Sequence, residues 1–303
     1  MRPLPELASS DVSRLDFVLP KFLRVAWVDD RTREVWEPRF AQIAHRWREI
    51  EWRTIVDGVR QCALIWLSHD ELVALAPVLG QHGIRAVPLT SSLRASAAKH
   101  RDALVYRVAI GRRRELSHFR KAWIRGDDDV IGQCLGYPKC CRAFFRRVVV
   151  KAGWLDPTWP RAVEATQSGE FQPSLDVQPP PELNPFWEPL GIRLVPHVAC
   201  SYGCDAARAF AAAFIATGRK AGYEPELDHS LEVMRWPVEW SALHGIAEIK
   251  TPIVKLSTRT DATPVKLILR YRGERYPQEG AHGVRFPYAV PARNAAIRLK
   301  IVD

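Results

Sequence analysis

The amino-acid sequence predicts an α/β fold with three parts: an N-terminal α/β layer, central cysteine-bearing helices and a β-rich C-terminal part. Three observations support this prediction. Residues 62–89 have a strand–helix–strand pattern, two cysteine-rich segments coincide with expected helix starts, and short β-type runs replace helical spacing after residue 231. We expect an α/β domain over 1–130 and a cysteine-cluster and β-rich domain over 131–303, with a proline-rich loop at 154–190.

The N-terminal layer begins after a loose arm at residues 1–16. Residues 22–28 form an apolar run that predicts a strand, and residues 36–60 have the composition of a helix. The apolar side chains of this helix recur at helical spacing: Phe40, Ile43, Trp47 and Ile50. Such a helix buries one face against a sheet or another helix.

The strand–helix–strand unit opens with the continuous apolar run at residues 62–67, typical of a buried strand. Ser68 and Glu71 have the spacing of a capping box at the start of the next helix, which Pro77 kinks or ends. Residues 84–89 then predict a second strand. Because two strands joined by a helix usually lie parallel, we expect a parallel pair here.

The pattern continues with a strand at residues 106–111 and a helix at 113–125. Pro138 fits the first turn of a further helix that extends to about residue 153, and Ser201 is the expected cap of an alanine-rich helix. Later runs predict the β-rich part. They comprise strands within 248–256 and 265–271, joined as a hairpin around 261–264, and a last strand at 295–302.

The composition, with 47% hydrophobic and 26% charged residues, is ordinary for a globular protein. No apolar run reaches the length of about 18 residues that a membrane helix needs, and the N-terminal residues lack a secretory apolar region. We therefore expect a cytoplasmic protein with no membrane partner. Because thiols stay reduced in the cytoplasm, its six cysteines favour metal binding or redox chemistry over disulfides.

Five of the six cysteines lie in residues 134–141 and 197–204, at the two expected helix starts. A helix N-terminus lowers the pKa of a thiol and so favours the thiolate that binds metals. Neighbouring helical residues point about 100° apart, so only one of Cys140 and Cys141 is expected to bind a given ion.

The expected ligands are thus Cys200, Cys204 and one of the adjacent pair Cys140 and Cys141. His197 and Cys134 compete for the fourth position. Three thiolates beside an open iron describe a [4Fe–4S] cluster, our preferred cofactor, and three thiolates with a histidine describe a Zn²⁺ site. Redox or nucleophilic thiols without metal and inert buried cysteines remain alternatives, while Cys62 is expected in the core.

The motif Leu-Gly-Tyr-Pro-x-Cys-Cys at 135–141, together with His-x-x-Cys-Ser-x-x-Cys at 197–204, resembles an uncharacterised bacterial and archaeal family of domains of unknown function. The segment at 240–252 is also similar to that family, so the resemblance covers about residues 130–260. It implies that Cys140, Cys141, His197, Cys200 and Cys204 act together, without Cys134. It implies no substrate.

The function we predict from these residues is an iron–sulfur enzyme that acts on a small molecule through an open iron, either a lyase for hydration or dehydration or a sulfur transferase. His244 and Glu248 are the candidate general acid and base, with a solvent-facing turn and strand as the simpler interpretation. The alternatives are a zinc-binding basic module that binds nucleic acid and a zinc hydrolase. The sequence has no dinucleotide-binding, P-loop or nucleophile-elbow motif.

The net charge of +10 adds RNA to the candidate partners. Arg112 and Arg113 lie at an expected helix start after a strand, where arginines and free backbone N–H groups can hold an anion. The simpler interpretation is a solvated helix end in an arginine-rich protein. No nucleic-acid-binding motif accompanies the charge.

Overall fold

The structure is a computed structural model of the whole chain. It describes residues 22–95, 102–151, 174–243 and 246–258, together with the short strands 266–270, 279–280, 283–284 and 298–302. The predicted arm at 1–16, the turn at 261–264 and the first part of the proline-rich loop lie outside the described residues. Within them, helices and antiparallel sheets occur in both halves, which confirms the α/β fold class.

A three-stranded antiparallel sheet forms the first layer, in the order β2 (Cys62–Ser68), β4 (Asp102–Gly111), β3 (Arg85–Ala95). The predicted parallel pair is wrong, because β4 lies between β2 and β3 and pairs antiparallel with both. Strands β3 and β4 pair along the whole length of β3, from Arg85 to Ala95. Strand β4 therefore occupies the position next to β2 that the prediction gave to β3.

Two helices pack on this sheet. Helix α2 (His69–Gln81) begins with the predicted capping box, in which Ser68 Oγ accepts from the Glu71 amide at 3.2 Å and Glu71 accepts from the Ser68 amide at 2.8 Å. Pro77 does not end this helix. Helix α3 (Arg113–Arg125) follows β4 and ends at Gly126 in the left-handed conformation. Leu116, Phe119 and Trp123 face the sheet from α3.

A five-stranded antiparallel sheet forms the second layer. Its order is β1 (Phe22–Trp27), β8 (Val254–Thr258), β7 (Ile246–Lys250), β6 (Val238–Leu243), β5 (Ser174–Val177). The predicted hairpin between the last two long runs is wrong. Strand β8 pairs with β1 and β7, whereas β9 (Lys266–Arg270) pairs with β12 (Arg298–Val302), and β10 (Glu279–Gly280) pairs with β11 (Gly283–Val284).

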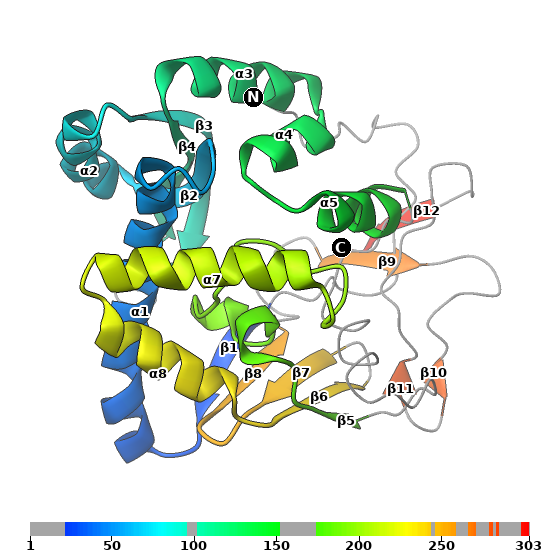
Figure 1. The fold of residues 1–303 in the computed structure, drawn as a ribbon. Helices are drawn as coiled ribbons and strands as arrows, with labels where there is room; N and C mark the ends of the chain where they lie inside the picture. Colours follow the sequence, from blue (N-terminus) through cyan, green and yellow to red (C-terminus); the bar gives the residue numbers. More distant parts are fainter. Residues whose placement is uncertain are drawn as a thin grey trace.

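Three helices cover the region between the layers (Figure 1). Helix α1 (Asp30–Val56) is the longest, and α7 (Asp205–Lys220) and α8 (Glu224–Met234) pack against it. The predicted apolar face of α1 is confirmed as buried, and it joins residues of β6, β7 and β8 in one core cluster. This cluster and the pairing of β1 with β8 both cross the boundary predicted at residue 130.

The central segment is a series of short helices: α4 (Asp128–Cys134), α5 (Lys139–Phe145) and a π-helical turn η1 (Arg146–Lys151). The expected helix is thus α-helical only to Phe145 and π-helical from Arg146 to Lys151, and its predicted last residues, 152–153, lie outside the described residues. Two 3₁₀ turns, η2 (Pro181–Leu183) and η3 (Glu188–Leu190), follow in the proline-rich part. Among the described residues, no helix is long and apolar enough to cross a membrane.

Candidate metal centre

The first cysteine segment enters the site through a proline. Pro138 is the N-cap of α5, and its fixed φ suits a helix start. Cys140 and Cys141 therefore fall in the first turn, as predicted. Cys140 is exposed at the surface, whereas Cys141 is buried.

The second cysteine segment lies before α7. The predicted Ser201 cap is wrong, because the helix begins at Asp205 and Cys204 itself is the N-cap. Residues 200–204 form a turn in which the Cys204 amide donates to the Ser201 carbonyl at 3.3 Å. Ser201 thus shapes the loop before the helix, and the turn brings Cys200 and Cys204 to one side. Figure 1 shows α5 beside the end of α7 at which α7 begins.

The two segments bring four thiols together, which we call the four-cysteine group: Cys140, Cys141, Cys200 and Cys204. Their Sγ atoms all lie within 4.8 Å of one another. The Sγ of Cys204 is 3.6 Å from that of Cys140 and 3.8 Å from that of Cys141. The group has the ligand type and the spacing of a metal site.

The adjacent cysteines differ from the prediction. Their Sγ atoms lie 4.0 Å apart, and both belong to the group, although we expected only one of them to face a single point. The helical angle fixes where each Cβ points, but rotation about χ1 moves the sulfur enough for both to converge. Cys140 reaches the group from the surface and Cys141 from the interior.

The electrostatics of the group favour binding a cation. Burial raises the pKa of Cys141, and it raises that of Cys200 to about 11. The pKa of Cys204 is lowered although burial acts to raise it, because the Ala207 amide and the neighbouring thiols donate to its sulfur. One thiolate is thus favoured by the start of α7. Cys141 and Cys200, whose pKa values are raised, lose their protons more readily beside the positive charge of a metal ion.

His197, a predicted ligand, is not part of the four-cysteine group. Its ring stacks on Tyr137 with the ring centres 4.8 Å apart, and it contacts Phe210 of α7. Burial, with a smaller effect from Arg60, lowers the pKa of His197 to about 4. The imidazole is therefore neutral at physiological pH, and the Tyr137–His197 stack joins the two cysteine motifs.

A buried polar network, which the sequence analysis did not identify, lies in this part of the core. Glu51 of α1 and Arg60 form an ion pair in which neither side chain is more than 1% exposed. Arg60 also donates to Thr54 Oγ1 at 2.8 Å, and Arg193 approaches Glu51 at 3.5 Å. The only sequence signal was spacing, because Glu51 follows Trp47 by four residues and so shares its buried face.

Gly136 shows how closely the first motif approaches this network. Its φ is +75°, and a Cβ placed there would lie 2.8 Å from the Cβ of Arg60 and 3.1 Å from the ring of Phe210. Both the backbone conformation and the space thus require glycine. The turn at Gly136 places Tyr137 over His197, and Tyr137 donates to the Pro196 carbonyl at 3.1 Å.

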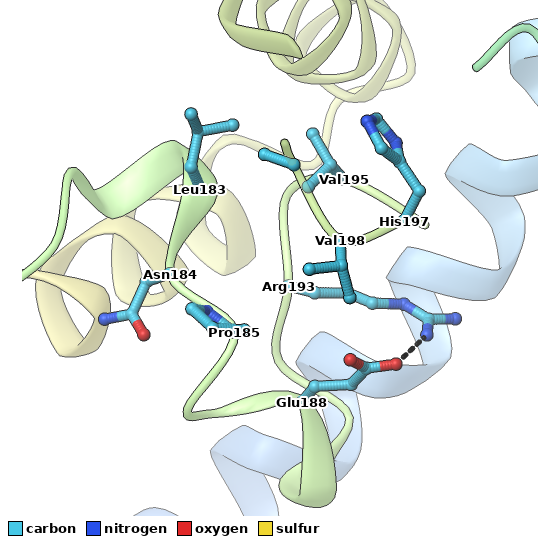
Figure 2. Close-up of a pocket in the computed structure, with 9 residues that line it drawn as sticks. Leu183, Asn184, Pro185, Glu188, Arg193, Val195, His197 and Val198 are labelled. Atoms are coloured by element: carbon cyan, nitrogen blue, oxygen red, sulfur yellow. Dashed lines mark hydrogen bonds and ion pairs between the residues drawn. The ribbon is translucent and has the colours of Figure 1, made fainter. Parts of the chain in front are cut away.

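Figure 2 shows a small cavity beside the second motif. His197 and Val198 lie on one side of it, and Arg193 forms an ion pair with Glu188 at 3.1 Å along its wall. Its volume is about 10 Å³, close to the minimum for one water molecule. Both ring nitrogens of His197 are buried without a protein partner. This cavity has no room for a substrate.

The other predicted site residues are not part of the four-cysteine group. His244 is outside the described residues. Glu248, on β7, forms an ion pair with Lys255 on β8 at 2.6 Å. Arg112 is the N-cap of α3, and Arg113 is its first residue; both are exposed. Cys62 and Cys134 are buried together in a separate apolar cluster, which agrees with a structural role for both.

Comparison of the chain with family models, with curated proteins and with solved structures finds no match. The resemblance carried by the two cysteine motifs therefore stays a prediction.

Proposed function

We propose that the protein binds one Zn²⁺ ion through Cys140, Cys141, Cys200 and Cys204, and that the ion fastens the start of α5 to the start of α7. The sulfur spacing carries this proposal. Three of the Sγ–Sγ separations are 3.6, 3.8 and 4.0 Å. Zn–S bonds of about 2.3 Å in a tetrahedron put the sulfurs about 3.8 Å apart.

The same spacing is a reason to prefer one ion over the [4Fe–4S] cluster predicted from the sequence. In a cubane cluster each cysteine binds a different iron, so the sulfurs stand at separate corners and lie farther apart than two ligands of one ion. Four thiols within 4.8 Å of one another leave little space for four irons and four sulfides. A single tetrahedral ion accounts for all four thiols.

The number of ligands also favours a structural site over a zinc hydrolase. A catalytic zinc site typically keeps one position open for water or substrate, whereas a structural site is closed by four protein ligands. The four-cysteine group supplies four. Of the two acid–base candidates, Glu248 forms an ion pair with Lys255 and is not part of the four-cysteine group.

Metal and sulfide analysis of protein purified anaerobically tests the proposal. We expect one zinc per chain and no acid-labile sulfide. Replacement by Co²⁺ should produce the absorption of a tetrahedral tetrathiolate site. Iron together with sulfide, or protein without any metal, would overturn the proposal.

Single substitutions then assign the ligands. Each of the variants Cys140→Ser, Cys141→Ser, Cys200→Ser and Cys204→Ser is expected to lose tight metal binding. The matched control is Cys134→Ala, because Cys134 lies in the same segment but outside the four-cysteine group. If Cys140→Ser or Cys141→Ser keeps stoichiometric zinc with an unchanged cobalt spectrum, only one of the adjacent cysteines is a ligand.

A further inference from the structure

Helix α3 presents an unusually basic surface. Six basic side chains are exposed on the helix and its N-cap, and we call them the α3 basic face: Arg112, Arg113, Arg114, Arg120, Lys121 and Arg125. The exposed His118 adds a seventh donor-bearing side chain. The only acidic residue of α3, Glu115, is half-buried. The exposed side of this helix therefore has one sign of charge.

These cations are not neutralised within the described part of the chain, where none of the six forms an ion pair. Other arginines do so: the exposed Arg33 pairs with Glu37 at 2.9 Å, and the half-buried Arg48 pairs with Glu71 at 2.6 Å. The acidic run at residues 127–129, directly after α3, does not fully neutralise these cations, because Asp129 pairs with Arg142 and Arg146. Such a positive field attracts an anionic partner.

The surface is also hollowed. Five side chains from successive turns of α3 border an open depression of about 530 Å³: Arg113, Arg114, Ser117, His118 and Lys121. Every one of them can donate a hydrogen bond, and none is acidic. Arginine binds phosphate oxygens in pairs through its planar fork, and lysine adds a point charge.

The arrangement selects among anionic partners. A helix of 13 residues is about 20 Å long, so cations spread along it cannot all contact one small anion. A membrane surface is disfavoured because Leu116, Phe119 and Trp123 are buried in the core. Ile124 is then the one large apolar side chain that α3 exposes, which is too little for an inserting apolar face. A nucleic-acid strand, with a phosphate about every 3.4 Å of helix axis, matches both the length and the charge.

We propose that the α3 basic face binds the phosphate backbone of a nucleic acid, with little dependence on base sequence. This inference is independent of the proposed zinc site, since α3 contributes no residue to the four-cysteine group. Contacts to phosphates provide affinity and orientation, whereas base contacts provide specificity. Binding should therefore be similar for sequences of different composition and should weaken steeply with salt.

The experiment measures fluorescence anisotropy of labelled mixed-sequence RNA and DNA with the full chain at several salt concentrations. Replacement of Arg113, Arg114 and Lys121 by glutamine should weaken binding at least about tenfold and reduce the salt slope by roughly 2–3, at close to one per lost contact. The matched control replaces the exposed arginines Arg31, Arg219 and Arg235 by glutamine, which removes the same charge from other helix ends.

We expect the control variant to bind within about threefold of the unmodified protein, because its arginines belong to α1, α7 and the end of α8 and not to the α3 basic face. Equal losses in both variants would show that only net charge matters and would overturn the proposal. Absence of salt-dependent binding by the unmodified protein would do the same. Tighter binding to polyglutamate than to RNA or DNA would assign the face to an acidic protein instead. Thermal melting of both variants verifies that they are folded.

Discussion

The Glu51–Arg60 network and the four-cysteine group are both polar sites inside the protein, yet they differ in how their polar atoms are satisfied. The carboxylate of Glu51 receives hydrogen bonds from Arg60, Trp47 and Arg193, so opposite charges and donors meet within the chain. The contacts of the four thiols are mainly Sγ–Sγ contacts with one another. The polar atoms of the Glu51–Arg60 network are thus satisfied within the chain, whereas a cluster of four thiols is compatible with a bound cation.

The largest effect is expected at the four-cysteine group. Cys204→Ser should remove the metal and lower the free energy of unfolding by several kcal/mol, since structural zinc contributes about 10 kcal/mol or more in small domains. Chelation of the unmodified protein should have the same effect in thermal melting. Cys134→Ala is the control and should cost only about 1–2 kcal/mol, with full metal content.

The Glu51–Arg60 network should be next in size and should be independent of metal. Arg60→Met removes the closest cationic partner of the buried Glu51, which keeps only Trp47 and the more distant Arg193, and should cost about 3–5 kcal/mol. The double variant Glu51→Leu and Arg60→Met should be more stable than Arg60→Met alone, because no unpaired charge remains. Denaturant titration measures both. Loss of zinc from either folded variant would contradict the separation of the two regions.

A smaller, pH-dependent effect is expected from His197, which lies between the two regions. As the pH falls below 6.5, His197 is protonated in the unfolded chain. In the folded chain, where its pKa is about 4, it is protonated only near pH 4. The contribution of His197 to the free energy of unfolding is therefore complete above pH 6.5 and decreases towards pH 4, by up to about 3 kcal/mol.

His197→Phe keeps an aromatic ring against Tyr137 but cannot titrate. The difference in stability between this variant and the unmodified protein should therefore change between pH 6.5 and pH 4. Comparison at matched metal content separates this effect from acid release of the ion. A difference that stays constant across this range would show that the imidazole is not held neutral in the folded state.

The smallest effect is expected at Glu248, which belongs neither to the Glu51–Arg60 network nor to the four-cysteine group. Its ion pair with Lys255 is partly exposed, so Glu248→Gln should change the free energy of unfolding by less than about 1 kcal/mol. Metal content should stay unchanged. Lys255→Gln is the matched control, because it breaks the same pair from the other strand. A loss of bound metal in Glu248→Gln alone would link this residue to the four-cysteine group.

Much of the local structure could be predicted from the sequence. Helical spacing identified the buried face of α1, the Ser68–Glu71 capping box marked the start of α2, and Pro138 placed Cys140 and Cys141 in a first helical turn. These features depend on residues that are close in the chain, and their signals are therefore local. The same reasoning selected all four members of the four-cysteine group as candidates.

Tertiary structure decided which of these elements meet. The place of β4 between β2 and β3, and of β1 beside β8, depends on pairing between distant segments that no local pattern encodes. The convergence of both adjacent cysteines with Cys204 likewise depends on side-chain rotation and on how α5 packs beside α7. The sequence by itself determined which thiols are candidates and that Cys140 and Cys141 stand in a first helical turn. Only the packed chain determined that the sulfurs stand at the spacing of one ion.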